Sequence, residues 1–296
     1  MKSGRPFFGK GDAVDSTYRL LRDGSAEHLV EWRDYIESLW RRYEGNQDTN
    51  FLEDAKAHFL PRFWEMYLWL SMSERGCNPV RVGSSGSEFY VELNGRRYWV
   101  EAVCPSKGEG ADAIPDPPVN MSIARKVPVE SIMLRYARTV RQKALKHQDA
   151  DIPAGRASLE DGYLLAISSS AMSFDARCGG ERPYLVKAAY GLGPLTLPID
   201  VATGAAGEAF HVAQPDIEKS NGNTVSMGFL LDGRYPLLSG IIHSTVGFTN
   251  TRLSLGDDFE WLANARADVP VPMDAFPWMR RWHVEGDFLL RLERNA

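Results

Sequence analysis

The sequence predicts an α/β fold in which a mixed central sheet is flanked by helices. Two helical patterns open the chain, an Asn-Gly pair at 94–95 joins two apolar strand segments, and a further helix leads into another buried strand. This order of elements is typical of a mixed sheet with helices packed on it. We therefore expect an N-terminal helical extension over residues 1–50 and a single α/β domain over residues 51–296, with a minimal core at about residues 55–170.

The N-terminal helices are predicted from the spacing of apolar residues. Residues 15–45 carry leucine, isoleucine and tryptophan at steps of three and four, and the pattern stops at Gly45. A second helix is expected from about Leu52 to Glu74, with Gly76 as its C-terminal cap. Its apolar side chains go almost all the way round, which indicates a buried helix.

Strand signals follow this second helix. A short strand is expected near residues 80–82, followed by a Ser/Gly turn over 83–87 and a hairpin formed by residues 87–93 and 98–103. Asn94-Gly95, flanked by alternating apolar residues, is the strongest short-range hairpin signal.

The remaining elements are predicted from similar patterns. A Pro- and Gly-rich loop over 104–128 leads into a third helix over about residues 129–147, with Pro128 near its start. Two further buried strands are expected at 162–168 and 184–190. Later strands are expected near residues 195–201 and 239–246, and the tail, 282–290, ends the fold.

Composition is typical of a soluble globular protein. The apolar fraction of 44% is ample for a core, and the formal net charge of -5 argues against a uniformly basic nucleic-acid coat. The three cysteines are scattered without a CxxC pair, which favours a reducing compartment. The sequence shows no apolar leader and no run of about 18 apolar residues. We expect a cytoplasmic protein with no membrane partner.

Three glutamates occupy positions that the patterns predict to be functional or buried. Glu101 shares a strand face with bulky apolar side chains, where an unpaired carboxylate is costly. Glu88 opens the partner strand of the hairpin, and Glu65 lies within the all-round apolar helix. Structural interpretations remain open: an ion pair with Arg62 for Glu65, and a solvent-facing strand edge for Glu88.

Together the three acids fit a hard divalent cation. Carboxylates from two neighbouring strands and a packed helix are oxygen ligands of the kind that Mg²⁺ accepts. Such an ion can activate water for attack on a phosphodiester and stabilise the leaving oxygen. No HExxH motif occurs and the six histidines are dispersed, so nothing supports a zinc site or a Ser-His-Asp triad.

The same residues carry a resemblance to a known family. Three segments resemble the helix acid, the "P-D" strand and the "E-x-K" strand of the PD-(D/E)XK, or restriction-endonuclease-like, nuclease superfamily. The resemblance implies a restriction-endonuclease-like core, with Glu65 as the auxiliary helix acid, Glu88 as the usual Asp and Glu101 as the central acid. The segments are Phe63-Trp64-Glu65-Met66-Tyr67-Leu68, Gly86-Ser87-Glu88-Phe89 and Trp99-Val100-Glu101-Ala102-Val103.

Two positions depart from the family pattern. Ser87-Glu88 replaces Pro-Asp, and Val103 stands where the family has a lysine that positions the attacking water. Lys143, at one edge of the apolar arc of the third helix, is the first candidate replacement, and the resemblance permits a lysine on this helix. Alternatively, Lys143 extends along the apolar surface into water. Lys107, in the Pro/Gly loop, is the second candidate, with an ordinary loop lysine as its alternative.

Two functional hypotheses follow. In the first, the chain is a divalent-metal-dependent nuclease, a phosphodiester hydrolase. Glu88 and Glu101 bind Mg²⁺ or Mn²⁺, Glu65 holds a metal-bound water, and Lys143 orients the nucleophile. Its partner is nucleic acid, with DNA expected, and the basic stretch over 135–146 either contacts phosphates or forms a solvated helix face. In the second, the chain is a catalytically inactive nuclease-fold protein that binds nucleic acid or a protein partner, which the missing motif lysine favours.

Overall fold

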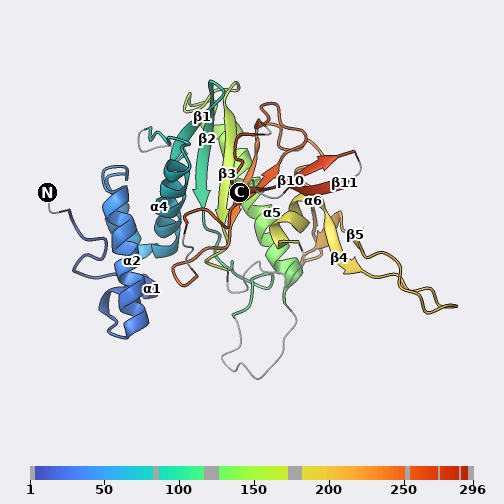
Figure 1. Ribbon diagram of the computed structural model, residues 1–296, viewed down its shortest axis with the longest axis horizontal. Helices are drawn as coiled ribbons and strands as arrows, with labels where there is room; N and C mark the ends of the chain where they lie inside the picture. Colours follow the sequence, from blue (N-terminus) through green and yellow to red (C-terminus); the bar gives the residue numbers. More distant parts are fainter. Residues whose placement is uncertain are drawn as a thin grey trace.

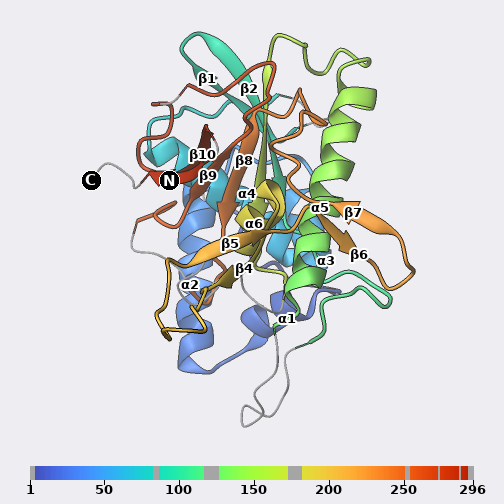
Figure 2. The same ribbon diagram turned by 90° about the vertical axis from the view of Figure 1, so that its right-hand side faces the viewer.

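A mixed seven-stranded sheet forms the centre of the protein, with helices on both of its faces (Figure 1, Figure 2). This confirms the predicted class, a mixed α/β sheet flanked by helices. The computed structural model describes residues 4–82, 87–116, 127–172, 182–250, 254–272, 274–286 and 288–292. The helices are α1 (Ser16–Asp23), α2 (Glu27–Tyr43), α3 (Phe51–Ala57), α4 (Phe59–Glu74), α5 (Val129–Lys146), α6 (Tyr184–Tyr190) and the π-helical turn η1 (His147–Asp151). The strands are β1 (Phe89–Leu93), β2 (Arg96–Val103), β3 (Gly162–Ser168), β4 (Leu192–Thr196), β5 (Phe210–Ala213), β6 (Asp216–Glu218), β7 (Thr224–Ser226), β8 (Gly240–Ser244), β9 (Glu260–Ala263), β10 (Arg280–Glu285) and β11 (Phe288–Leu292).

The large sheet has the strand order β1-β2-β3-β8-β9-β10-β11. β1 and β2 are antiparallel, whereas β2, β3 and β8 run parallel, with α5 in the connection from β2 to β3. β8 and β9 are antiparallel, β9 and β10 parallel, and β10 and β11 antiparallel. On the far side of β1, Val80 forms an antiparallel bridge with Tyr90, so the strand predicted at 80–82 is reduced to a single bridge.

The predicted hairpin is confirmed. Its turn residues, Asn94 and Gly95, have φ values of 50° and 75°, the left-handed conformation that a two-residue hairpin turn requires. The register pairs Phe89 with Val100 and Leu93 with Arg96. Continued by one residue, this register brings Glu88 opposite Glu101.

The two faces of the sheet belong to two apolar cores. Because successive side chains of a strand point to opposite faces, Tyr98 and Val100 of β2 pack in the core that contains α4, and Trp99 packs in the core that contains α5. Trp64 fixes α4 to the sheet through its Nε1–H, which donates to the carbonyl of Ala166 at 3.0 Å. By the same alternation, Glu101 lies on the α5 face.

The helices are divided more finely than predicted. The helix expected over 15–45 is two helices, α1 and α2, separated at Gly24, and the helix expected over 52–74 is divided at His58 into α3 and α4. α2 lies beside α4, away from α5 (Figure 1), and its Ile36, Leu39 and Trp40 enter the α4 core. The third predicted helix is confirmed as α5. No helix within the described ranges combines the length and apolar character needed to span a membrane.

The strand predicted at 184–190 is wrong, because this segment is the helix α6. All seven of its residues are buried, so the run has neither the period of a helix nor that of a strand. Pro183 precedes its first turn, and Gly191, with φ of 64°, ends it in the left-handed conformation. β8 confirms the strand at 239–246, β4 covers only the start of the strand expected near 195–201, and the tail forms β10 and β11. Residues 83–86 of the expected turn lie outside the described residues.

Candidate active site

Glu101 is the centre of a buried polar cluster between β2 and α5. Its side chain is only 3% exposed, and both carboxylate oxygens have donors. Lys143 Nζ lies 2.6 Å and Lys146 Nζ 3.2 Å from Oε1, and the Tyr163 hydroxyl donates to Oε2 at 2.5 Å. These charged and neutral donors offset the desolvation of the carboxylate.

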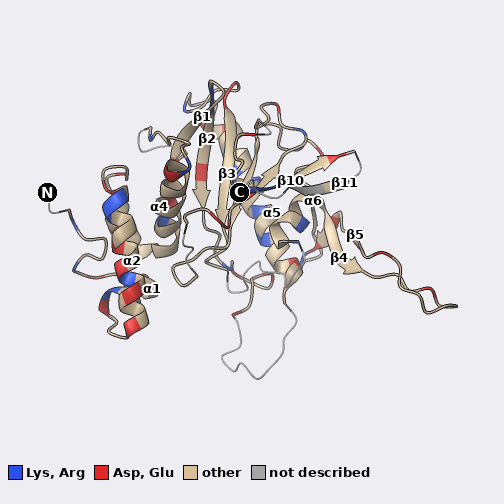
Figure 3. Ribbon diagram, in the orientation of Figure 1, with Lys and Arg blue, Asp and Glu red and all other residues tan. Residues whose placement is uncertain are grey.

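Lys143 points from α5 toward β2. Its side chain is 28% exposed and ends on Glu101 rather than in water. Figure 3 shows the acidic position on β2 and basic positions on α5. Lys107, the second candidate, is exposed and pairs instead with Asp116, its Nζ 2.7 Å from Oδ2. Val103 packs against the apolar core of the α5 face and provides no charge.

Glu88 lies beside Glu101 with a different environment. Its Oε2 accepts a hydrogen bond from the backbone N–H of Ala102 at 2.6 Å. Among the described residues, no lysine or arginine forms an ion pair with it. Burial and then the negative charges of Glu101 and Glu65 raise the pKa of Glu88 from 4.5 to about 8. Glu88 therefore holds a proton near neutral pH unless a cation joins the pair.

The raised pKa makes the stability of the protein fall with rising pH between 4.5 and about 8. Across this window the folded chain holds the Glu88 proton and the unfolded chain does not, so stability present below 4.5 is lost as the pH rises through 8. Glu88→Gln should remove this dependence and be more stable than wild type by about 4 kcal/mol at pH 8, with little difference at pH 4.5.

Urea unfolding across this pH range measures the difference. Glu92→Gln, an exposed change on the same hairpin, is the matched control and should keep the wild-type pH slope. An unchanged slope in Glu88→Gln would show that Glu88 ionises normally in the folded protein.

Glu65 is held on the α4 side of the sheet by three donors. Arg62 Nη1 lies 2.6 Å from Oε2, the Tyr43 hydroxyl donates to Oε1 at 3.0 Å, and Arg81 also pairs with Oε1. The ion pair with Arg62 that the sequence offered as a structural interpretation is present. Glu65 is 3% exposed, and its charge acts on Glu88. Its contacts to described residues are those of a structural ion-pair cluster.

Glu65→Gln should therefore destabilise the fold strongly. The change leaves Arg62 and Arg81 partly buried without their shared carboxylate, and breaking a buried pair in this way costs about 3 kcal/mol. Chemical denaturation measures this loss. Glu53→Gln, which breaks an exposed pair with Lys56, should change stability by less than about 0.5 kcal/mol. Equal effects of the two changes would contradict a structural role for the Glu65 cluster.

The structure adds contacts that the sequence did not indicate. Lys146 and Tyr163 both contact Glu101, and the His147 ring stacks on Tyr163 with centroids 4.0 Å apart and planes at 5°. Asp151, at the end of η1, is buried and accepts from Arg156 Nε at 2.8 Å. Lys146 lies three residues after Lys143, a spacing that places both near one side of the helix. Nothing local in the sequence points to Tyr163, because its position depends on the parallel register of β2 and β3.

No protein-family model, curated protein or solved structure matches this chain. In the part of the chain that the structure describes, no group of three or more His, Cys, Asp or Glu side chains is placed to hold a metal ion. A metal at this site would therefore rest on two carboxylates, Glu88 and Glu101, with water as its other ligands. Mg²⁺ accepts such a set, since it is usually bound by one or two carboxylates and keeps several waters.

Proposed function

We propose that the chain is a divalent-metal-dependent nuclease of restriction-endonuclease-like fold, which hydrolyses phosphodiester bonds of nucleic acid. The observation that carries this proposal is the 2.6 Å contact between Lys143 Nζ and Glu101 Oε1, with Glu88, the residue before β1, beside Glu101. Two acids and a lysine thereby meet at the hairpin and the helix that follows it. This is the constellation that the family resemblance implies, with the lysine supplied by α5.

The order of elements also supports the proposal. α4 is followed by the Val80 bridge, the hairpin β1–β2, the crossover helix α5 and the parallel strand β3. This is the helix, strand and helix order expected for the core at about residues 55–170. The hairpin carries both acids, and the crossover helix carries the lysine.

The residues fit a divalent cation in their charge and ligand type. Glu88 and Glu101 are neighbouring carboxylates, and the pKa of Glu88 is raised partly because its neighbour is charged. A cation between such acids would relieve their repulsion, and Glu88 would release its proton on binding. When bound, Mg²⁺ or Mn²⁺ would supply an activated water and stabilise the leaving oxygen.

The chain's own side chains would then orient and stabilise the reacting groups. Tyr163 and Lys146 hold the Glu101 carboxylate in place through Oε2 and Oε1, respectively. Lys143 brings a positive charge beside Glu101, where an ammonium group can position the attacking water and stabilise negative charge on the phosphate. DNA is the nucleic acid we expect as substrate.

A second candidate function is a catalytically inactive nuclease-fold protein that binds nucleic acid or a protein partner. One observation favours it: Glu101 already has three donors, so its charge is satisfied by the chain itself. In this case divalent cations would not stabilise the fold.

Cleavage assays distinguish the two functions. Single- and double-stranded DNA and RNA are incubated with wild type in Mg²⁺, Mn²⁺ or EDTA. The nuclease should cut at least one substrate with a divalent cation and none in EDTA. Its unfolding free energy should also rise by RT ln(1 + [M]/Kd), about 2.7 kcal/mol at a metal concentration of 100 Kd. Absence of both cleavage and stabilisation would favour the inactive binding protein.

A further inference from the structure

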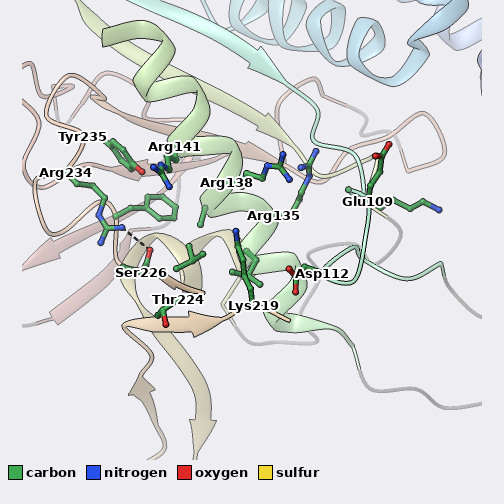
Figure 4. A pocket seen from close by; sticks show the side chains of 16 residues that line it. Glu109, Asp112, Arg135, Arg138, Arg141, Lys219, Thr224, Ser226, Arg234 and Tyr235 are labelled. Carbon is green, nitrogen blue, oxygen red and sulfur yellow. Dashed lines mark hydrogen bonds between the residues drawn. The ribbon is translucent and has the colours of Figure 1, made fainter. Parts of the chain in front are cut away.

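A second concave site lies on the outer side of α5. It is a pocket of about 460 Å³ bounded by the loop after β2, by α5, and by the small hairpin β6–β7 with the segment that follows it (Figure 4). The hairpin and the loop are joined by a hydrogen bond from the backbone N–H of Ser220 to Asp112 Oδ1 at 2.9 Å. Three different segments therefore build its walls.

The lining of this pocket is strongly basic in a protein whose net charge is negative. Six cations line it, against the two carboxylates of Glu109 and Asp112. Figure 4 shows Arg135, Arg138 and Arg141 in a row along α5, with Lys219 on the opposite wall. The six cations are Lys107, Arg135, Arg138, Arg141, Lys219 and Arg234.

Three of these six cations have a hydrogen-bond or ion-pair partner for their side chain in the described part of the protein, and three do not. Lys107 pairs with Asp116, Arg234 pairs with Asp232, and Arg135 Nε donates to the carbonyl of Ser106 at 2.7 Å. The side chains of Arg138, Arg141 and Lys219 form no hydrogen bond or ion pair with any described residue. The Arg138 charge, after burial, also lowers the pKa of Arg135. Like charges are thus gathered around an open space, an arrangement that an anionic ligand would relieve.

The pocket is separate from the Glu101 cluster. At 100° per residue, Lys143 is turned by about 160–220° from Arg138 and Arg141, so they project from different sides of α5. Lys143 faces the sheet, whereas both arginines are exposed. The pocket is therefore a binding surface beside the proposed active site and not part of it.

The chemistry of the lining favours phosphate groups. Arginine offers a planar fork of donors that matches phosphate oxygens, and lysine adds a point charge. From Arg135 to Arg141 the helix rises by about 9 Å, which is long enough for these arginines to contact neighbouring phosphates of one strand. The volume, within the range of small-ligand sites of about 300–1,000 Å³, is too small to enclose a duplex.

We propose that this pocket binds the phosphates of single-stranded nucleic acid, with Arg138, Arg141 and Lys219 as the direct contacts. The choice of a nucleic-acid strand among phosphorylated ligands rests on the proposed function. The pocket would then hold a strand against one side of α5 while Lys143 and Glu101 act from the other side of that helix.

The test measures binding without catalysis. Wild type and the triple variant R138Q/R141Q/K219Q are titrated into labelled single-stranded DNA, single-stranded RNA and duplex DNA in EDTA, at several salt concentrations. Loss of three phosphate contacts should reduce the salt slope of log K for single strands by about 2. Single-strand affinity should fall at least tenfold, with a smaller effect on duplex.

Matched controls separate the local site from net charge. The variant K10Q/R19Q/R41Q removes the same charge from exposed positions near α1 and α2, and it should bind like wild type.

Each possible result either supports or overturns the proposed binding site. The proposal would be overturned if both triple variants lost the same affinity for single strands. It would also be overturned if only the affinity for duplex fell. Binding of a mononucleotide as tight as that of a strand would overturn it as well, since the pocket would then be a small-ligand site. Selective loss of strand binding in a protein that cleaves nothing would support the pocket and refute the nuclease proposal, so the two fail independently.

Discussion

Glu101→Gln should abolish metal-dependent cleavage. The amide keeps the size of the side chain and can still accept a hydrogen bond from Tyr163, but it removes the charge that a divalent cation and Lys143 both require. Loss of a carboxylate metal ligand, together with disturbance of the neighbouring lysine, should lower kcat by about a thousandfold or more. Single-turnover cleavage with saturating Mn²⁺ measures the effect.

The variant should also lose the stabilisation by divalent cations that wild type shows. Glu92→Gln, an exposed position on β1, is the matched control and should retain both cleavage and stabilisation. Circular dichroism and binding of nucleic acid in EDTA verify that Glu101→Gln is folded. If the folded variant cleaves at the wild-type rate, Glu101 is not part of the active site.

Lys143→Met should reduce cleavage by about a hundredfold with little change in KM. Methionine keeps most of the volume of the lysine stem and removes the ammonium group at 2.6 Å from Glu101. Lys146 and Tyr163 still contact the carboxylate, so the loss of stability should be modest, about 1–2 kcal/mol. The separation of kcat from KM distinguishes a role in the reaction from one in substrate binding.

Lys146→Met is the matched control, because Lys146 contacts the same oxygen from 3.2 Å and its side chain is 39% exposed. This change should lower kcat by less than tenfold. A larger effect at Lys146 than at Lys143 would assign the role of the missing strand lysine to Lys146. Wild-type activity in both variants would show that neither lysine takes that role.

The sequence predicted the parts of the fold that depend on local signals. Asn94-Gly95 requires left-handed backbone and so determined the hairpin and the neighbourhood of Glu88 and Glu101. The apolar spacing in α5 predicted the ends of this helix to within one residue at the C-terminus. It also placed Lys143 at the edge of the apolar arc, which faces the sheet. Gly24 and His58 divide helices whose apolar spacing continues across the break, which is why these were predicted as single helices.

Features that depend on how distant segments pair and pack could not be predicted from the sequence. α6 is buried on every side, so its pattern carries no period that would distinguish a helix from a strand. Tyr163 meets Glu101 only because β2 and β3 pair with Trp99 beside Tyr163, a register that the chain between them does not encode locally. Arg81, the second cation on Glu65, comes from the segment after α4, and its approach requires the fold around Val80.

The most direct measurement of the central claim is the position of a divalent cation in the folded protein. Crystals grown at or above pH 8, where Glu88 can ionise, are soaked in Mn²⁺ and examined by anomalous scattering. We predict one strong peak at the paired carboxylates of Glu88 and Glu101 that disappears in Glu101→Gln. A peak confined to other sites, or none here while Lys143 stays paired with Glu101, would contradict the metal-dependent active site.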